Sequence, residues 1–239
     1  MPIKVILFDF GGTLDSNGLT WLSRFQPIYA AHGIRFSLDK FASAFYSADD
    51  NLASRYRLAG LGLEKTLRLQ VHDVLETLAP DRLADAGTIA GRFLLESRGC
   101  LLNTQPLLKQ LSKRFSLGIV SNFYGNLESV LESEGLRNFF GTVADSGAVG
   151  CLKPEPGIFL HALRALGASP AEALMVGDSI ERDMKGAERL GMRHAWLRGT
   201  RPSDSACCLG AHVLSSLGEL GARLTDLSAD IVPACEGAT

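Results

Sequence analysis

Short apolar runs alternate along this chain with longer segments in which apolar residues recur at helical spacing. The first run, Val5 to Phe8, contains no polar residue, which is typical of a strand buried on both faces of a parallel sheet. Comparable runs end at Ser121 and just before Asp178, and another covers 194–197. Because helical segments separate these runs, the pattern predicts an α/β fold with helices on both faces of a parallel sheet.

The strand pattern disappears between residues 16 and 99, where we expect four helices. Ser16 and Asn17 are candidate N-caps for the first of them, and Pro27 is expected to kink or divide it. Glycines follow each of the first two helical segments, and a proline opens the fourth. The expected helices cover about 19–32, 38–58, 63–78 and 80–99.

The alternation of strands and helices resumes near residue 101. A helix is expected over 104–113, with Pro106 in its first turn. The short tail 226–239 is rich in small residues and is expected to be poorly ordered. The expected strands cover 115–121, 142–144, 173–176, 194–197 and 211–214, and the helices between them cover 127–134, 156–166 and 183–190.

Composition places the chain among ordinary globular proteins. Its 239 residues suffice for a large core, and 46% of them are apolar while 21% are charged. The net charge of −2 gives no reason to expect nucleic acid or an acidic membrane surface as a partner. No apolar run approaches the roughly 18 residues of a membrane span. The N-terminal run is too short for a signal peptide.

The five cysteines show neither a Cys-x-x-Cys pair nor a histidine at zinc spacing. They are therefore interpreted as reduced thiols of a cytoplasmic protein, not as a disulfide framework or a metal site. The cysteines are Cys100, Cys151, Cys207, Cys208 and Cys235.

Candidate chemistry begins directly after the first strand. Asp9 ends the apolar run and is followed by Gly11 and Gly12. In open α/β sheets the ligand crevice lies at the carboxyl ends of the strands, so a carboxylate and glycine backbone here suit a ligand site. A tight turn after a strand explains the same short motif equally well.

Three later segments carry further candidate residues. Ser121 ends a second apolar run, and Lys153 precedes a helix whose start is fixed by Pro156. A further run ends in an acidic pair, Asp178 and Asp183. Hard carboxylate oxygens of this kind suit Mg²⁺. The alternative for the pair is a solvated turn with a helix cap.

In this order and at these separations, the four segments resemble the haloacid dehalogenase-like superfamily, most of whose members are magnesium-dependent phosphatases. The resemblance covers about residues 1–15 and 100–200. It implies a Rossmann-like core formed by 1–15 and 100–225, with an all-helical cap inserted at 16–99. It also implies a small phosphorylated metabolite as the partner; the oligomeric state stays open.

The resemblance assigns a role to each motif residue. Asp9 is expected to attack phosphorus and form an acyl-phosphate, which divides hydrolysis into two easier steps. Mg²⁺ is assigned to Asp9, to the backbone carbonyl of Gly11 and to Asp178, and Asp183 completes the acidic pair. A cation at this place would offset the repulsion between the nucleophile and an anionic substrate.

Phosphoryl oxygens are expected to meet three side chains and a set of backbone amides. Ser121 and Lys153 would donate to these oxygens, and Thr13 would take part in an anion cradle of the backbone type. A helix cap or a surface charge is the alternative for a lone serine or lysine. The amides expected to take part are those of Gly11, Gly12 and Asn122.

Position 11 departs from the phosphatase pattern. Phosphatases of this superfamily usually carry an aspartate there, which protonates the leaving alkoxide and then activates water. Such acid–base help is worth roughly 10²–10⁴-fold, and Gly11 supplies none of it. Three hypotheses follow: a Mg²⁺-dependent phosphohydrolase whose substrate has a good leaving group or whose acid comes from elsewhere, a weakened or inactive protein that binds a phosphorylated ligand or a partner, and a dehalogenase. The acidic Asp178 argues against the last.

Substrate preference in this superfamily depends on cap residues. Trp21 is expected near the entrance of the site, and Arg24 is a candidate for holding a second anionic group, because a guanidinium matches carboxylate and phosphate. The alternatives are a core tryptophan and a solvated helix face. The other candidates are Asn17, Arg55, Tyr56 and Arg57.

Overall fold

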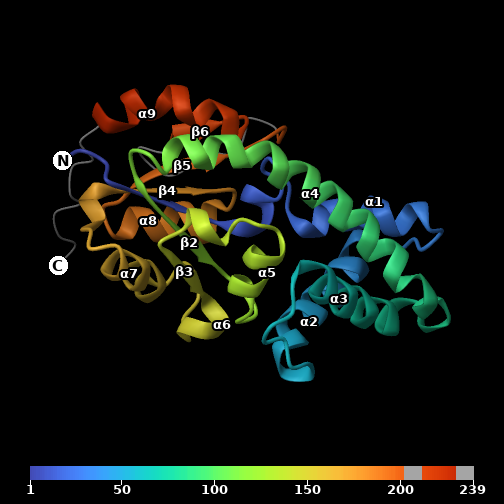
Figure 1. Ribbon diagram of the computed structural model, residues 1–239. Helices are drawn as coiled ribbons and strands as arrows, with labels where there is room; N and C mark the ends of the chain where they lie inside the picture. The colour runs from blue at the N-terminus through green and yellow to red at the C-terminus, as the bar shows by residue number, and fades with distance from the viewer. Residues whose placement is uncertain (202–211, 230–239) are drawn as a thin grey trace, which may run out of the picture.

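One parallel sheet forms the centre of the protein (Figure 1). The computed structural model describes residues 1–201 and 212–229, with side chains as far as residue 224. In this part of the chain six strands lie in the order β3-β2-β1-β4-β5-β6. Their bounds are β1 (Val5–Phe8), β2 (Ser116–Ser121), β3 (Thr142–Asp145), β4 (Ala173–Gly177), β5 (Arg193–Leu197) and β6 (His212–Leu214). The predicted α/β class is confirmed.

Helices connect the strands and cover the sheet. The α-helices are α1 (Trp21–Ala31), α2 (Leu38–Arg55), α3 (Leu63–Leu78), α4 (Ala86–Leu111), α5 (Leu127–Ser133), α6 (Ser146–Val149), α7 (Pro156–Ala165), α8 (Lys185–Arg189) and α9 (Leu220–Ala229). Short helical turns cover Phe10–Leu14, Pro80–Asp85, Arg137–Phe139, Pro170–Glu172, Ile180–Met184 and Leu217–Glu219. None of the described helices is long and apolar enough to cross a membrane.

Side chains that alternate along β1 enter two different hydrophobic clusters. Ile6 and Phe8 pack on one face of the sheet, in the cluster that includes residues of α4, α5 and α9. Val5 and Leu7 pack on the other face, against residues of α7 and α8. Each face of the strand is therefore buried, which explains why the sequence of β1 contains no polar residue.

The predicted helical insertion lies beside the sheet, where α1, α2 and α3 gather around the far half of α4 (Figure 1). The expected end of a helix near Arg98 and Gly99 is wrong, and so is the separate helix from residue 104. One helix, α4, runs through both positions and carries Pro106 in its interior. Buried residues such as Phe93 and Leu108 lie on both sides of the expected break, so packing overrides the weak helix propensity of glycine.

Smaller differences concern the ends of other elements. Thr20 caps α1 in place of Ser16 or Asn17: its side chain accepts a hydrogen bond from the Ser23 amide. Pro27 does not divide α1, which is continuous. The last described helix extends to residue 229, so the tail expected from residue 226 is helical at its start, and its remainder, 230–239, lies outside the described residues.

Replacing Gly99 with alanine tests the continuity of α4. Gly99 is exposed, and a Cβ atom built on it meets no other atom within 4 Å. Alanine is favoured over glycine in a helix interior by roughly 0.5–1 kcal/mol, so Gly99→Ala is expected to raise the free energy of unfolding by about this amount in urea titration.

Gly118→Ala is the matched control for this substitution. Gly118 lies in β2, and its Cβ would approach Leu7 and Thr142 side-chain atoms to 2.9 Å, so this variant is expected to lose stability. A Gly99→Ala variant that gains nothing would contradict a continuous helix at this position.

Candidate active site

The predicted motif residues meet at the carboxyl edge of the sheet. Phe8 pairs with Ile119 of β2 and with Val176 of β4, so the ends of these three parallel strands are in register. Asp9, Ser121 and the loop after β4 consequently lie side by side, as expected for a ligand crevice in an open α/β sheet.

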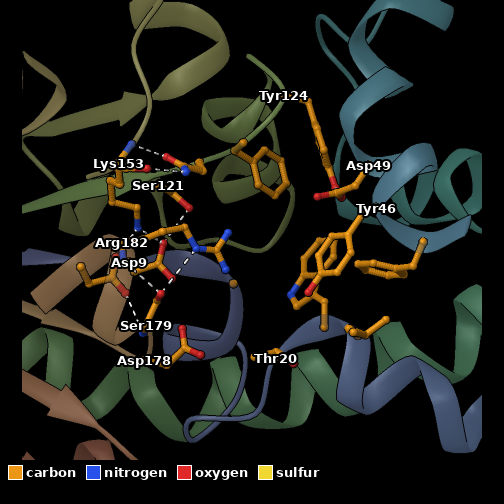
Figure 2. A pocket seen from close by; sticks show the side chains of 17 residues that line it. Asp9, Thr20, Tyr46, Asp49, Ser121, Tyr124, Lys153, Asp178, Ser179 and Arg182 are labelled. Atoms are coloured by element: carbon orange, nitrogen blue, oxygen red, sulfur yellow. Dashed lines mark hydrogen bonds and ion pairs between the residues drawn. The ribbon is translucent and has the colours of Figure 1, made fainter. Parts of the chain in front are cut away.

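Asp9 is the centre of a buried hydrogen-bond network (Figure 2). Its Oδ1 accepts hydrogen bonds from the Ser121 hydroxyl at 2.8 Å and from Lys153 Nζ at 2.6 Å. Lys153 Nζ also donates to Asp183 Oδ1 at 2.6 Å, and the lysine side chain is only 2% exposed. The structure thus brings together one residue from each of the four predicted motifs.

Three acidic side chains gather around Asp9 in this network, Asp9 itself included. Oxygen atoms of Asp9, Asp178 and Asp183 all lie within 4.8 Å of one another. Burial and the neighbouring charges of Asp9 and Asp183 raise the pKa of Asp178 to about 8. This excess of negative charge fits a divalent cation with a preference for hard oxygen ligands. Gly11, whose carbonyl was predicted as a further ligand, lines the same pocket.

Burial and neighbouring charges also shift the pKa values of Lys153 and Asp183. Burial by itself lowers the pKa of Lys153, but the charges of Asp183 and Asp9 together outweigh burial and raise it. Burial raises the pKa of Asp183, against the opposing charge of Lys153. Lys153 therefore stays protonated as a fixed cation between two carboxylates.

Two glycines permit this crowding. Gly12 has a φ of +90°, and a Cβ atom built on it would lie 2.7 Å from Asp178 Oδ1. A Cβ on Gly177 would collide with the Asp183 carboxylate, which is held by the Ser179 amide at 2.9 Å. Both positions need glycine because the carboxylates occupy the space of a side chain.

One of the predicted anion-binding groups, the Gly12 amide, is engaged within the protein, whereas the predicted roles of the Asn122 backbone amide and of Thr13 stay predictions. The Gly12 amide donates to Asp15 Oδ1 at 2.7 Å, so it is not free to bind a substrate oxygen. The side chain of Asn122 fixes the Lys153 backbone, accepting from its amide at 2.7 Å and donating to its carbonyl at 3.2 Å. Thr13 is fully buried, and its hydroxyl has no hydrogen-bond partner within the described residues.

Asp15 holds a second buried network that the sequence analysis missed. Its Oδ2 accepts from Trp21 Nε1 and Arg24 Nη1, both at 2.8 Å, and from the Ser97 hydroxyl at 3.2 Å. Arg24 also donates to Ser97 and stacks over Phe93, with its Cζ 3.8 Å from the ring centroid. The network joins the loop after β1 to α1 and α4. Nothing in the sequence pattern distinguishes Asp15 from a surface aspartate.

The predicted substrate contact of Arg24 is therefore wrong. Arg24 is 7% exposed, is paired with Asp15 and does not line the pocket beside Asp9. Trp21 does line that pocket, as expected for a residue near its entrance.

Trp21 also fills the space beside Gly11. A Cβ atom built on Gly11 would lie 3.2 Å from Trp21 Nε1. The indole consequently occupies the region next to the position where related phosphatases are expected to carry their acid–base aspartate. Any larger residue at position 11 requires the indole to shift.

The pocket beside Asp9 encloses about 100 Å³ and has two unlike walls. The motif residues of the core form one wall, and aromatic residues form the other (Figure 2). Lining residues that the sequence analysis did not select are Thr20, Leu22, Phe45, Tyr46, Asp49, Phe123, Tyr124, Ser179 and Arg182. The spacing of Phe45 on α2 marks it only as an apolar helix residue.

The four other cap candidates lie outside the pocket beside Asp9. Arg55 pairs with Glu76 at 2.8 Å, and the Tyr56 hydroxyl donates to Asp73 at 2.6 Å. Asn17 accepts a hydrogen bond from the Leu217 amide. None of these three residues, nor Arg57, lines the pocket beside Asp9.

A family model described as haloacid dehalogenase-like hydrolase matches residues 3–191, which include every motif of the site. The chain belongs to this family. The predicted family membership is thereby confirmed, and at the level of the family so is the prediction of a hydrolase.

Relatives of this family member include named phosphatases. The phosphoserine phosphatase of Thermus thermophilus is 33% identical over 66% of this chain and 68% of its own length. The glyceraldehyde 3-phosphate phosphatase of Pyrococcus furiosus is 31% identical over 82% of this chain and 81% of its own length. Haloacid dehalogenase-like hydrolase domain-containing protein 3 of Mus musculus is 42% identical over 50% of this chain, but the match spans only 49% of that protein.

Solved structures agree with the fold of this family member. A HAD phosphatase from Thermococcus onnurineus superposes with a TM-score of 0.54 and 26% identity, covering 96% of this chain and all of the other. A 2-haloacid dehalogenase from Pseudomonas syringae also superposes with a TM-score of 0.54, covering 94% of this chain and 99% of the other. Its 22% identity supports the shared fold alone.

Asp15→Asn is expected to destabilise the protein by roughly 3 kcal/mol, because it leaves the buried Arg24 guanidinium without its counter-charge. The measurement is the free energy of unfolding in urea. Asp50→Asn on the exposed side of α2 serves as the control and should change stability by no more than about 0.5 kcal/mol. Equal stability of the two variants would show that the Asp15 network contributes little.

Proposed function

We propose that this protein is a Mg²⁺-dependent phosphatase that acts on a small phosphorylated metabolite through an aspartyl-phosphate on Asp9. The observation that carries the proposal is the buried cluster in which Asp9 lies beside Asp178 and Asp183 and accepts a hydrogen bond from Lys153. It combines a nucleophile, a hard-oxygen cation site and a fixed positive charge, which together suit phosphoryl transfer.

The named relatives support phosphate ester cleavage but not one substrate. A phosphoserine phosphatase, glyceraldehyde 3-phosphate phosphatases and a pyrimidine 5′-nucleotidase all match this chain. Their names share the phosphate and differ in the group that carries it. Cleavage of a phosphate group is therefore proposed for this chain, whereas the names of the relatives do not select one substrate.

Asp9, Asp178 and Asp183, with the Gly11 carbonyl, are the groups that would hold Mg²⁺. Bound there, the ion would supply positive charge that offsets the repulsion between carboxylates and a phosphoryl group. The fit rests on the donor set itself, because three buried carboxylates face one another, with Lys153 between Asp9 and Asp183 and Arg201 3.9 Å from Asp178. Burial and the charges of Asp9 and Asp183 raise the pKa of Asp178, against the opposing charges of Arg201 and Lys153.

The hydrogen bonds at Asp9 select the attacking oxygen. Ser121 and Lys153 both donate to Oδ1, and within the described residues no donor contacts Oδ2. Oδ2 would form the bond to phosphorus while the bond from phosphorus to the leaving oxygen breaks. Water then cleaves the acyl-phosphate and restores the Asp9 carboxylate.

The leaving oxygen needs a proton that position 11 does not supply. Trp21 Nε1 lies closest to this position, but its hydrogen is engaged by Asp15. Substrates with good leaving groups, such as acyl phosphates, or substrates that carry their own acid therefore suit this site better than simple alkyl phosphates. Dehalogenation fits less well, because Asp178 places an acidic side chain that suits a metal ion beside Asp9.

We place this reaction in the cytoplasm. Both cysteines in the described part of the chain, Cys100 and Cys151, are free thiols, which supports a reducing compartment.

Phosphate release from a panel of phosphomonoesters and acyl phosphates tests the proposed function. Turnover should require Mg²⁺, and Asp9→Asn should lower kcat by at least about 10³-fold, because the amide is a poor nucleophile. Asp50→Asn, a change of the same chemistry on the surface, should keep wild-type activity. Activity that survives in Asp9→Asn without Mg²⁺ would refute the proposal. Absence of turnover in folded wild-type protein would favour a ligand-binding role.

The raised pKa of Asp178 predicts pH-dependent Mg²⁺ binding. In metal-free protein the folded state binds this proton more tightly than the unfolded chain, so stability falls as the pH rises towards about 8. Protons compete with Mg²⁺ below that pH, and each unit lowers the apparent affinity by about tenfold. The rise in Tm on adding Mg²⁺ should therefore be larger at about pH 8.5 than at about pH 6.5.

Asp178→Asn is the matched variant for this measurement. It removes the titrating group and a predicted ligand, so both the Mg²⁺-induced rise in Tm and its pH dependence should diminish. An equal rise in Tm at both pH values in wild-type protein would contradict the prediction.

A further inference from the structure

Arg182 is a cation in the wall of the active-site pocket that forms no ion pair with the described residues. It lies in the turn Ile180–Met184, directly before Asp183, and its side chain is exposed. Its guanidinium extends into the space between Asp9 and the aromatic wall that includes Tyr46 (Figure 2). The side-chain contact of Arg182 in the described residues is a weak one, from Nε to the Ser179 hydroxyl at 3.5 Å.

Asp49, the acidic residue on the opposite wall, forms hydrogen bonds with other residues and, in the described part of the chain, no ion pair with Arg182. Asp49 of α2 accepts hydrogen bonds from the Tyr124 hydroxyl and from Gln70 Nε2. Burial raises the pKa of Asp49, which favours its neutral form, although the charge of Arg182 acts in the other direction. Among the residues that the structure describes, Arg182 forms no ion pair, so its terminal nitrogens face the pocket without a carboxylate in contact with them.

Lys153 and Arg182 therefore offer the pocket two different cations. Lys153 is buried and already bridges Asp9 and Asp183, where the phosphoryl group is proposed to bind. Arg182 lies at the pocket surface and keeps its planar fork available, which matches the two oxygens of a carboxylate. A substrate with a phosphate alone would leave this fork unused.

We infer that Arg182 is a specificity-determining residue that binds a carboxylate of the substrate. The preferred substrates are then short phosphate esters that also carry a carboxylate, and this inference rests on the proposed phosphatase function. A carboxylate suits the site better than a second phosphoryl group, because the pocket already holds several acidic side chains and a dianion would be repelled more strongly. The volume of about 100 Å³ favours a small molecule.

Arg182 and not Arg24 is then the arginine that would bind a second anion. Arg24 was the predicted candidate, but it is paired with Asp15. Arg182, which comes from the core, takes the place in the pocket that the cap arginine does not reach.

Two matched pairs of ligands test the role of Arg182. In the first, kcat/KM is compared for 3-phosphoglycerate and glycerol 3-phosphate, which differ in a carboxylate against a hydroxymethyl group. In the second, Kd is measured by calorimetry with Mg²⁺ for 3-phosphonopropionate and propylphosphonate, which differ in a carboxylate against a methyl group and are not turned over. The second pair reports binding whether or not the protein is an active phosphatase.

Arg182→Met should reduce the preference for the carboxylated member of each pair by roughly 10- to 100-fold, the usual effect of losing a charge-assisted hydrogen bond. Arg182→Lys should retain part of the preference, because it keeps the charge and loses the fork. The control is Arg189→Met, an exposed arginine of the neighbouring helix α8 outside the pocket, which should keep the wild-type ratio.

The outcomes separate this inference from the proposed function. Wild-type protein without a preference for the carboxylated ligands, or a preference that Arg182→Met leaves intact, would overturn the role of Arg182 even if Mg²⁺-dependent turnover is present. A phosphonate preference that depends on Arg182, found together with no hydrolysis of any phosphate ester, would support the carboxylate site and refute the phosphatase. Since Arg182 is exposed, its variants are expected to fold, which circular dichroism can verify.

Discussion

The buried ion pair between Lys153 and two aspartates is the interaction on which the rest of the site depends. Lys153 Nζ lies 2.6 Å from both Asp9 and Asp183, so one ammonium group joins Asp9, directly after β1, to the acidic loop after β4. Removing a charge from water is costly unless a partner and hydrogen bonds compensate. Here Ser121 and the Ser179 amide complete the set of donors to the two carboxylates. These hydrogen bonds and ion pairs thus stabilise the buried arrangement of Asp9, Lys153 and Asp183.

A second constraint is space. The loop after β1 passes beside Asp178 and beside the indole of Trp21. A side chain at Gly11 would meet Trp21, and a side chain at Gly12 would meet Asp178. Asp15 anchors this loop by accepting from the Gly12 amide and from Arg24. The absence of an acid at position 11 is consequently part of a packed arrangement and not an isolated substitution. It directs the proposed chemistry towards substrates that need little help with the leaving group.

The pocket combines aromatic and charged side chains from both parts of the chain. Trp21 of α1 and Tyr46 of α2 line it together with Tyr124, which follows β2, and Asp49 of α2 adds an acidic group to the side opposite Arg182. Helix α4 connects the two parts without interruption, and Ser97 and Phe93 on it contact Asp15 or Arg24 directly. The pocket is therefore bounded by helices of the segment 16–99 and by the loops at the carboxyl edge of the sheet.

The sequence by itself determined the parallel sheet and the members of the buried cluster at its carboxyl edge, such as Asp9 and Lys153. Buried strands leave uninterrupted apolar runs, and the chemistry at their ends is local to each motif. Only the tertiary structure decided which arginine reaches the pocket. The local sequence does not show that Arg24 pairs with Asp15 while Arg182 lines the pocket. It also decided that α4 continues through Gly99, since burial on both sides of that residue outweighs its own propensity. Such long-range contacts have no signature within a short stretch of sequence.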